Sequence, residues 1–343
     1  MNRQPSIDVV ALDERISAVL DVVALGNALV DILSHEHDDL ITRLGSEKGT
    51  MHMVDAARAD EVYAAMGPAR EVSGGSAANT ATGIASFGGA AAYIGRVADD
   101  TFGSVFAHDL RGAGVRFDAP LASNGQPTGR CLVLVTPDAQ RTMFTFLGAA
   151  TELDPNYVDE SLISDARVTF LEGYLWDQPP AKDAIRRAAS IAHAAGGRVA
   201  LTLSDPFCVE RHRDEFRHLI EQEIDIVFGN EEELRSLYQV DSFDDALQHV
   251  RGHCEIAALT RGARGSVVVG GDEVHVIDAV PVQVVDTTGA GDLYAAGFLY
   301  GITHGHDLAT AGRLASLAAG EVISHLGARP ETDLSELARP LLG

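Results

Sequence analysis

The sequence predicts an α/β protein with a doubly wound, mostly parallel sheet flanked by helices and a small inserted β-sheet that acts as a lid. Two patterns support this fold class. Short apolar runs alternate with helical patterns along most of the chain, which is typical of parallel βαβ units. Two segments break this alternation and contain strand-like runs without long helical periods, which indicates a second, smaller sheet.

The large unit is predicted from apolar runs bounded by turn residues. These runs predict buried strands at residues 19–25, 168–172, 198–203, 224–228, 256–259 and 266–269. Helical patterns between them lie at residues 180–195 and 231–238. A last short strand is expected at 282–285, followed by a glycine loop and a helix through 293–300. We assign residues 18–30, 55–114 and 148–343 to this large α/β domain.

The small β lid is predicted from residues 31–54 and 115–147. Strand-like runs lie at 129–136 and 142–147, and the tetrapeptide between them (PDAQ) begins with proline, which favours a turn. Because no Ser-rich or Pro-rich linker separates these segments from the rest, we expect an inserted lid and not a tethered module. Residues 1–17 show no stable period, and we expect them to form a mobile leader.

Composition favours a folded protein that acts on small molecules. Hydrophobic residues make up 46% of the chain and charged residues 22%, which is compatible with a sizeable core. The formal net charge is −24, and this field disfavours nucleic acid and anionic membranes as partners. Three widely spaced cysteines indicate neither a disulfide framework nor a thiolate zinc site. With no signal-peptide pattern, we expect a cytoplasmic monomer or homodimer.

Several familiar motifs can be set aside. Neither of the two lysines, Lys48 and Lys182, is followed by Ser or Thr, which excludes a P-loop. Residues 289–291 begin like a dinucleotide fingerprint, but Tyr294 stands where the third glycine is needed. Residues 35–39 (HEHDD) look like a metal cluster, yet neighbours on an extended segment point to opposite faces. We interpret that segment as an exposed loop.

The strongest chemical signal is residues 286–292 (DTTGAGD), at the start of the last expected helix. Amides at a helix N-terminus lack intrahelical partners and the helix dipole adds positive partial charge. Small residues at Gly289, Ala290 and Gly291 let a phosphate approach the backbone. Asp292 would stabilise the helix in any case, but beside a phosphate its charge is costly unless it accepts a proton from an attacking hydroxyl. We therefore predict an anion hole with Asp292 as catalytic base.

These residues resemble the C-terminal signature of the ribokinase-like, or PfkB, family of carbohydrate and nucleoside kinases. Residues 74–79 (GGSAAN), with 95–100 (GRVADD) and 102–103 (FG), are similar to the N-terminal signature of that family. The resemblance extends from about residue 21 to residue 330. It implies a doubly wound core that binds nucleotide and substrate, covered by a β lid.

The resemblance implies roles for individual residues. Asp292 would be the base, and Gly289, Ala290 and Gly291 would hold the developing charge. Arg141, at the lid hairpin, resembles an arginine that neutralises the transferring phosphate, and a plain exposed turn residue is the alternative. The residues expected to contact substrate are Asn27, Asp31, Gly74, Gly75 and Asn79. Asp31 can accept hydrogen bonds from vicinal hydroxyls at the end of the first strand, where a simple turn Asp is the alternative.

The nucleotide side is expected at two loops that follow strands. The residues implied in ATP binding are Asn230, Glu233, Thr260, Gly262 and Gly265. Asn230 and Glu233 match an Asn-x-x-Glu motif that helps to order Mg²⁺ and its waters, and the same pair is compatible with a helix capping box. The resemblance further implies a monovalent cation such as K⁺ near the backbone of Asp286 and Thr288.

Subgroup features favour a nucleoside substrate. Residues 26–31, 126–129 and 203–207 look more like adenosine kinases than ribokinases, and the glycine block reads Gly-Gly-Ser where a ribokinase has Gly-Gly-Lys. We predict ATP-dependent transfer of the γ-phosphoryl group to a primary hydroxyl of a nucleoside, adenosine first. A sugar kinase of the same family, for ribose, fructose or another sugar, and a non-catalytic sensor stay open. Candidates to stack on a base are Phe144, Phe146, Tyr174 and Trp176, although core packing explains each of them as well.

Overall fold

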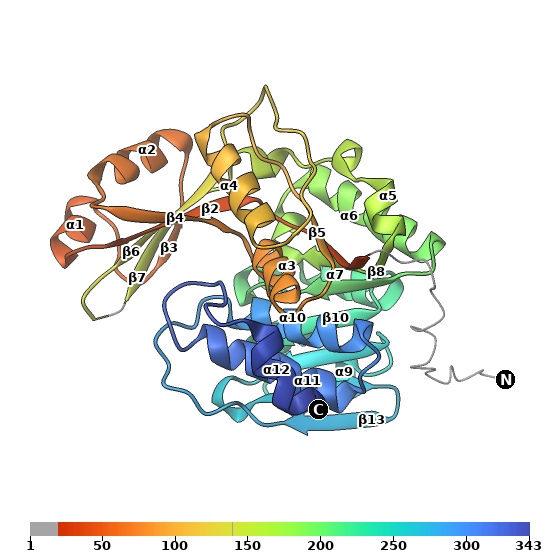
Figure 1. The fold of residues 1–343 in the computed structure, drawn as a ribbon. Helices are drawn as coiled ribbons and strands as arrows, with labels where there is room; N and C mark the ends of the chain where they lie inside the picture. The colour runs from red at the N-terminus through yellow and green to blue at the C-terminus, as the bar shows by residue number, and fades with distance from the viewer. Residues whose placement is uncertain (1–19, 139) are drawn as a thin grey trace.

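Two sheets of different size organise the computed structural model, which describes residues 20–138 and 140–343 (Figure 1). The large sheet has eight strands and the small sheet has five. The leader expected at 1–17 and the turn residue Ala139 lie outside the described residues. The predicted fold class, a mostly parallel sheet with flanking helices and a second small sheet, is confirmed.

The large sheet carries most of the predicted strands. Its order is β13 (Glu273–Ile277), β12 (Ser266–Gly270), β11 (Ile256–Thr260), β10 (Ile226–Asn230), β9 (Arg198–Thr202), β8 (Ala166–Glu172), β1 (Leu20–Leu25) and β5 (Ala91–Ile94). From β11 to β5 every neighbouring pair is parallel, whereas β12 and β13 add antiparallel pairs at the other edge. The chain runs from β1 to β5 on one side and returns to β8 on the other, so β1 lies at a topological switch point, where open α/β sheets bind ligands.

Helices cover both faces of the large sheet and enclose two hydrophobic clusters. The first cluster involves α3 (Ser76–Ser86), α4 (Thr101–Gly112), α10 (Ala290–Thr303), α11 (Leu308–Val322) and α12 (Leu334–Leu342). The second involves α5 (Glu160–Ser164), α6 (Pro179–Ala194), α7 (Pro206–Gln222), α8 (Glu231–Tyr238) and α9 (Phe243–Val250). Short 3₁₀ turns connect some of these elements at η2 (Gly148–Glu152), η3 (Pro155–Tyr157), η4 (Gly173–Asp177) and η5 (Gly262–Arg264). The helices predicted at 180–195 and 231–238 are thus confirmed as α6 and α8.

Close packing fixes the position of α10. A Cβ added at Gly297 would lie 2.5 Å from the carbonyl oxygen of Leu314, and one at Gly301 would lie 2.7 Å from Cα of Ala311. Only glycine therefore lets α10 approach α11 this closely. These contacts set the position of α10, which carries Asp292 in its first turn.

The small sheet has the order β3 (Met51–Met53), β7 (Arg141–Phe146), β6 (Gly129–Val135), β2 (Leu29–His35) and β4 (Ala69–Gly74). One of its faces is buried against α1 (Asp38–Arg43) and α2 (Ala56–Ala65). The predicted hairpin is present: β6 and β7 pair antiparallel, and the amide of Thr136 donates to the carbonyl of Gln140 at 2.9 Å. Figure 1 shows this sheet projecting to one side of the large one.

The membership of the two sheets differs in two places from the segments we assigned. Ala69–Gly74 pairs with β2 as an edge strand of the small sheet, although its polar sequence gave no strand pattern. Residues 115–122 run beside β5 instead, through bridges from Arg116 to Ala92 and from Ala122 to Ala98.

The strand expected at 282–285 is wrong. No strand is assigned there; Val284 and Val285 are exposed, and the amide of Val285 donates to the carbonyl of Ile323 at the end of α11. A single backbone contact with a helix end replaces pairing with a neighbouring strand, so the apolar run never joins the sheet. The glycine loop still leads directly into α10, as expected.

Candidate active site

The predicted site residues gather where the parallel strands of the large sheet end. Asn27 follows β1, Asn230 ends β10 and Thr260 ends β11, and the last two are opposite each other in register. Asp31 lies on β2 of the small sheet, which starts shortly after β1. Helices α3 and α10 bring the two glycine blocks to the same edge.

Asp292 joins the two signature blocks. Its Oδ1 accepts a hydrogen bond from Oγ of Ser76 at 2.6 Å, and its Oδ2 accepts one from Nδ2 of Asn79 at 2.8 Å. Thr80 Oγ1 also donates to the backbone carbonyl of Asp292 at 3.1 Å. Burial raises the pKa of Asp292, while the bonds from Ser76 and Asn79 and the charge of Arg329 lower it in part. The carboxylate is therefore held in one orientation with a raised affinity for a proton.

Asp31 lies against the glycine turn that leads into α3. A Cβ at Gly74 would lie 2.3 Å from Cγ of Asp31, and a Cβ at Gly75, which has φ +96°, would lie 2.2 Å from the carbonyl oxygen of Asn27. Glycine is required at both positions, because a side chain would displace either the carboxylate or the strand end. Burial raises the pKa of Asp31 to about 7, with Arg329 lowering and Asp292 raising it.

Glu172, at the end of β8, is a residue that the sequence analysis did not single out. One carboxylate oxygen accepts from Nδ2 of Asn27 at 2.8 Å and the other from the amide of Ala77 at 3.0 Å. Burial raises the pKa of this carboxyl to about 7. Glu172 thereby ties the end of β1 to the first turn of α3. An acidic residue closing an apolar strand was the only available signal.

Arg329, in the segment between α11 and α12, was also missed. Its guanidinium donates to the carbonyl of Ser73 from Nη2 at 2.7 Å and to the carbonyl of Ala78 from Nη1 at 2.8 Å. Burial lowers its pKa to about 10, and the nearby carboxylates of Asp109, Asp31 and Asp292 act in the opposite direction. Nothing in the local sequence of this loop indicates these distant contacts.

The predicted anion hole forms the N-terminus of α10. Gly289 caps the helix in the left-handed conformation, with φ +76°, and Gly291 is exposed. A Cβ at Gly289 would lie 2.8 Å from Cα of Ala328, so this position also requires glycine. The first amides of the helix thus lie at an open end, beside Asp292.

Arg141 reaches the anion-hole loop from the small sheet. Its Nη1 lies 2.8 Å from Oδ1 of Asp286, and the Asp286 side chain is only 2% exposed. Asp286 also accepts bonds from the amide and hydroxyl of Thr288, at 2.8 and 2.7 Å, and from the amide of Gly327 at 3.0 Å. The hairpin of β6 and β7 and the loop that leads into α10 are therefore linked by an ion pair.

Asn230 and Glu233 form a complete capping box at the start of α8. The side chain of Asn230 accepts from the amide of Glu233 at 2.9 Å, and Glu233 Oε2 accepts from the amide of Asn230 at 2.9 Å. Oε1 of Glu233 additionally accepts from Nδ2 of Asn230 at 2.6 Å. Burial raises the pKa of Glu233 to about 7. Both carboxylate oxygens are thus engaged within the helix cap.

The second nucleotide loop is a tight, mostly exposed connection between β11 and β12. The amide of Arg261 donates to the carbonyl of Gly265 at 2.7 Å. Gly262 (φ +58°) is exposed with open space around it, whereas a Cβ at Gly265 would lie 1.9 Å from the carbonyl oxygen of Ile277. Gly262 is therefore accessible to a ligand, and Gly265 serves backbone packing.

Metal-binding side chains do not converge in the described part of the chain. Among residues 20–138 and 140–343, no group of three His, Cys, Asp or Glu side chains is arranged to hold a metal ion. A metal that arrives with phosphates needs no such cage, because Mg²⁺ usually keeps waters and bridges phosphate oxygens.

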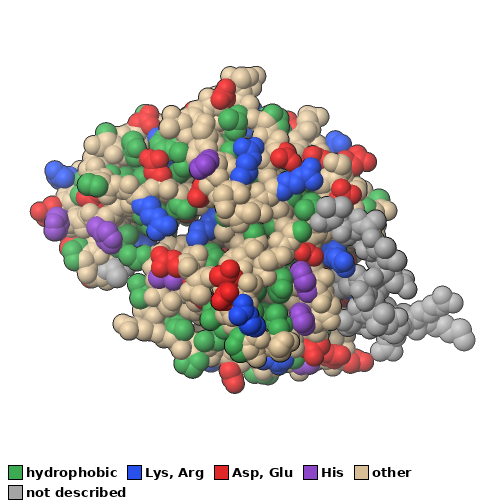
Figure 2. Space-filling view, viewed as in Figure 1, with side chains coloured by type: hydrophobic (Ala, Val, Ile, Leu, Met, Phe, Trp, Pro, Cys, Tyr) green, Lys and Arg blue, Asp and Glu red, His purple; other side chains and the backbone are tan. Residues whose placement is uncertain are grey.

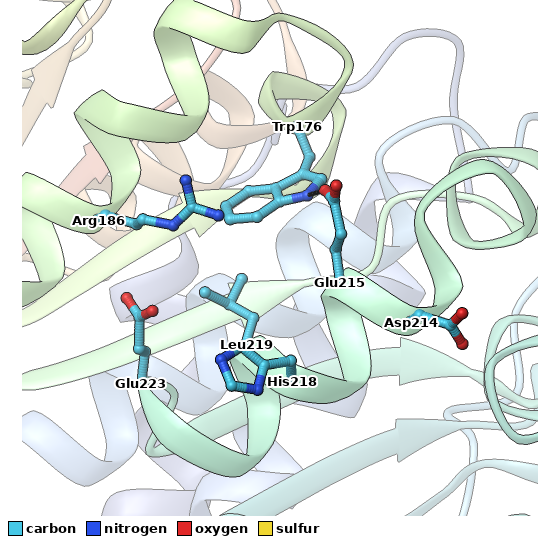
Figure 3. Close-up of a pocket in the computed structure, with 7 residues that line it drawn as sticks. All are labelled: Trp176, Arg186, Asp214, Glu215, His218, Leu219 and Glu223. Atoms are coloured by element: carbon cyan, nitrogen blue, oxygen red, sulfur yellow. Dashed lines mark hydrogen bonds between the residues drawn. The ribbon is translucent and has the colours of Figure 1, made fainter.

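The aromatic residues considered for base stacking lie mostly in the core. Phe144 and Trp176 are each 1% exposed and Phe146 is 7% exposed; Tyr174 is half-buried. Trp176 belongs to a hollow between α6 and α7, shown in Figure 3, where its Nε1 donates to Glu215 and the guanidinium of Arg186 lies 5.1 Å from its ring centre. This hollow contains none of the predicted site residues. Phe207, at the start of α7, is an exposed aromatic residue.

The face of the small sheet opposite α1 and α2 carries a row of apolar side chains beside Asp31. Strand pairing aligns Asp31 with Cys131 and with Thr145, and the next row aligns Leu33, Val133 and Met143. Arg141 extends from the same face to Asp286, so this face is turned toward the large domain. Leu33, Cys131 and Met143 are only partly buried. The surface facing the site is therefore mainly apolar.

The molecular surface shows no single basic patch on the side drawn in Figure 2, where Lys and Arg side chains lie singly among Asp and Glu. Among the described residues, no helix is long and apolar enough to cross a bilayer.

Comparison with known proteins gives consistent matches. The family described as pfkB family carbohydrate kinase matches residues 21–334. The structure of an adenosine kinase from Sinorhizobium meliloti is 50% identical with a TM-score of 0.87, covering 94% of this chain and 99% of that one. A probable sugar kinase from Rhizobium etli CFN 42 is 48% identical with a TM-score of 0.88, covering 94% and 98%. Adenosine kinase from Saccharomyces cerevisiae is 27% identical over 329 residues, covering 89% of this chain and 95% of the yeast protein.

Proposed function

This chain belongs to the pfkB family of carbohydrate kinases, and on that premise we propose that it transfers the γ-phosphoryl group of ATP to a primary hydroxyl of a nucleoside, with adenosine as the first candidate. The reaction class follows from the family: the enzyme is a phosphotransferase with an alcohol acceptor. The substrate and the residue roles below are our proposal. The observation that carries it is the meeting of the two glycine blocks at Asp292.

We assign Asp292 the role of general base. Ser76 and Asn79 each occupy one lone pair on its two oxygens, which leaves acceptor capacity on both for a substrate hydroxyl. The raised pKa brings the base closer to the pH at which it works, which favours proton transfer. ATP, bound with its divalent metal, supplies the phosphoryl group to the oxygen from which Asp292 takes the proton.

We assign to the anion hole the stabilisation of the negative charge that develops on the transferred phosphoryl group. The amides of Gly289, Ala290 and Gly291 lie one turn or less from Asp292 in sequence. The amide of Ala290 also donates to the carbonyl of Thr287 at 3.3 Å, and preorganised amides of this kind stabilise negative charge. Arg141 can add a guanidinium from the lid, since its present partner, Asp286, belongs to the same loop. These groups supply positive potential in a chain of net charge −24.

We propose that Asp31, Asn27 and Asn79 form hydrogen bonds with the substrate hydroxyls. The side-chain oxygens of Asn27 and Asn79 are buried and have no hydrogen-bond partner within the described residues, and buried acceptors of this kind are normally satisfied by a donor. Asp31 adds a carboxylate that can accept two further bonds. Gly74 and Gly75 let the turn lie directly against the Asp31 carboxylate and the carbonyl of Asn27, with no side chain between them.

The apolar face of the small sheet favours a nucleoside over a sugar. A free sugar presents hydroxyls on most of its edges, and these would lose hydrogen bonds against Leu33, Val133 and Met143. A purine base presents two apolar faces and would gain from the same surface. A sugar remains the second candidate, because the R. etli relative is a probable sugar kinase at 48% identity. We propose that residues 31–54 and 123–147 and the neighbouring strand β4 act together as a lid, while residues 115–122, which run beside β5, stay with the large domain.

Metal requirements form a separate part of the proposal. We expect Mg²⁺ to arrive with ATP and Glu233 to act through water, because both of its oxygens already cap α8. We expect a monovalent cation such as K⁺ to use backbone oxygens of Asp286 and Thr288, because the Asp286 carboxylate already accepts bonds from Thr288, Gly327 and Arg141. We propose a cytoplasmic enzyme, monomeric or homodimeric, that acts on small molecules.

An ADP-release assay over a panel of nucleosides and sugars tests the proposal. We expect adenosine to give the highest kcat/KM, with Asp292→Asn run in parallel to exclude a contaminating kinase. A higher kcat/KM for ribose or fructose would instead establish the sugar kinase. Calorimetric binding of a panel member without any ADP release would indicate a sensor. Replacing K⁺ by a bulky organic cation in the same assay should lower turnover, and unchanged turnover would remove the second ion from the proposal.

A further inference from the structure

Arg329 lies behind the glycine turn and contacts it at both ends. Nε and Nη2 donate to the carbonyl of Ser73 at 3.1 and 2.7 Å, and Nη1 donates to the carbonyl of Ala78 at 2.8 Å. The turn from Gly74 to Ala77 is enclosed between these two carbonyls. A planar guanidinium with a fixed fork of donors is the side chain best suited to hold two such groups at a set separation.

The enclosed turn controls the positions of both carboxylates of the site. Gly74 is in van der Waals contact with Asp31, as the close approach of an added Cβ shows. Ser76, at the other end of the turn, donates to Asp292 at 2.6 Å. A displacement of the turn would therefore move the support of Asp31 and of Asp292 together.

Arg329 forms no direct ion pair within the described residues. Within the described residues, the hydrogen bonds of its guanidinium go to the neutral oxygens of Ser73 and Ala78, and no carboxylate oxygen lies within 4.0 Å. Its positive charge nevertheless acts on Asp31 and Asp292, and it lowers the pKa of both. Two carboxylates near each other cannot readily both ionise without such a charge.

Most titratable side chains around Arg329 are acidic. The titratable groups that act on it or on the two carboxylates come from five elements: Asp31 on β2, Asp109 on α4, Asp292 on α10, Glu172 on β8 and Tyr93 on β5. Four of these five are acidic side chains. Asp109 accepts hydrogen bonds from the amide and the hydroxyl of Ser73, at 2.8 and 2.6 Å. Ser73 is the residue whose carbonyl accepts from Arg329. Arg329 is thus a cation surrounded by acidic side chains.

We propose that Arg329 is a positioning residue for phosphoryl transfer, whose guanidinium braces the glycine turn and supplies the positive charge that lets Asp31 and Asp292 both stay ionised in one site. This role rests on the proposed function for its kinetic consequence, but not for its effect on the carboxyl groups. The expected signature is a loss of activity that grows as the pH falls, because the carboxyls bind protons more readily once the cation is gone.

The experiment compares Arg329→Gln with Arg329→Lys. Gln keeps a donor for the carbonyls but removes the charge, whereas Lys keeps the charge and loses the fork. For Arg329→Gln we expect the acidic limb of the kcat/KM profile to move up by about one pH unit, the effect of removing one nearby opposite charge. The loss at pH 6 should then exceed the loss at pH 9 by about tenfold. Arg329→Lys should keep the wild-type midpoint, with a loss that does not depend on pH.

A second readout needs no substrate. Titration of ¹³C-labelled aspartate carboxyls by NMR, with Asp31 assigned from the spectrum of Asp31→Asn, should give a higher midpoint for Asp31 in Arg329→Gln than in the wild type. If the midpoint moves while no substrate is turned over by the wild type, the proposed function fails and the role of Arg329 stands. Arg213→Gln is the matched control for the carboxyl titration, because it removes a half-buried guanidinium that donates to the carbonyl of Ser236 on α8 and not to the glycine turn.

Two results would overturn the proposal. If the titration midpoint of the Asp31 carboxyl is the same in Arg329→Gln as in the wild type, the contacts of Arg329 are purely structural. A midpoint for Asp31 in folded Arg329→Lys that lies about one pH unit above the wild-type midpoint would show that the charge is not what matters, and because the reference is the wild type, this result decides the question even where the Gln variant does not fold.

Discussion

The two parts of the site that we propose for substrate and for nucleotide, called here the substrate side and the nucleotide side, are built by different means. On the substrate side, Asp292 is held by Ser76 and Asn79, more than two hundred residues away in sequence. On the nucleotide side, the contacts are local: Asn230 bonds to Glu233, and Arg261 bonds to Gly265. The substrate side depends on several elements that meet in space. The nucleotide side consists of short loops whose hydrogen bonds lie within the loop itself.

The difference also concerns ionisation. On the substrate side, burial raises the pKa of Asp31, Glu172 and Asp292, and Arg329 counteracts this at two of them. On the nucleotide side, Gly262 is exposed and offers backbone groups that do not titrate, and Glu233, whose pKa burial also raises to about 7, has both carboxylate oxygens engaged in the cap of α8. Acid–base chemistry therefore depends on the tertiary structure, whereas phosphate binding needs little beyond backbone at strand and helix ends. Substitutions and pH should affect the two sides unequally.

The largest expected effect is at Asp292. Asp292→Asn keeps the shape but removes the base, and we expect kcat to fall by at least about 10²-fold while substrate and ATP still bind. Steady-state kinetics with calorimetry checks this. Asp244→Asn, in the first turn of α9, controls for the loss of a helix-dipole interaction and should leave kcat unchanged. Near-wild-type turnover in Asp292→Asn would remove Asp292 from the role of base.

The next effect separates the two sides directly. Asp31→Ala removes a carboxylate that accepts substrate hydroxyls, and we expect substrate affinity to fall by roughly 10- to 100-fold, as for lost hydrogen bonds to a charged group. ATP affinity should be nearly unchanged, because Asp31 lies on the substrate side. Calorimetry of each ligand alone provides the measurement. Equal losses for both ligands would make Asp31 a structural residue.

The pH dependence of binding should follow the same division. The pKa of Asp31 is raised to about 7, and its charged form is the better acceptor, so substrate affinity should decline as the pH falls below about 7. ATP affinity should change less over the range from pH 8 to pH 6. Calorimetric titrations at fixed ionic strength measure both. A substrate affinity that stays constant over this range would contradict an ionised Asp31 as the binding group.

The smallest effect is expected at the contact between lid and catalytic loop. Arg141→Ala removes the ion pair with Asp286 and the cation that the lid brings to the phosphate, and we expect kcat to fall by about tenfold with smaller changes in either affinity. Arg43→Ala, on exposed helix α1 of the same small sheet, is the control. An unchanged kcat in Arg141→Ala would return Arg141 to a surface role.

Local patterns were sufficient for much of this architecture. The strands of the large sheet are continuous apolar runs between turn residues, because a parallel sheet buries both of its faces. The glycines at 74, 75 and 289 could be singled out because motif and conformation agree: each has a backbone or side chain within 3 Å of where a Cβ would be. Asp292 was identifiable because it follows the glycine loop at the start of a helix.

Partner-dependent features escaped the sequence analysis. Val282 to Val285 is as apolar as a strand, but whether it pairs depends on which edge is free, and here it meets the end of α11. Ala69–Gly74 is too polar for a buried strand, and it pairs only because β2 offers an open edge. Strand membership is a property of two segments, so one segment alone cannot determine it.

The sequence by itself determined the fold class, the two glycine blocks and Asp292 at the end of the second block, because each is written in consecutive residues and follows from backbone geometry. Only the tertiary structure decided how the acids of the site are held. The hydrogen bonds that Glu172 accepts from Asn27 and Ala77, and those that Arg329 donates to Ser73 and Ala78, join residues far apart in the chain. The pKa of a buried carboxyl depends on charges and donors within a few ångströms, and those neighbours are set by folding and not by sequence order.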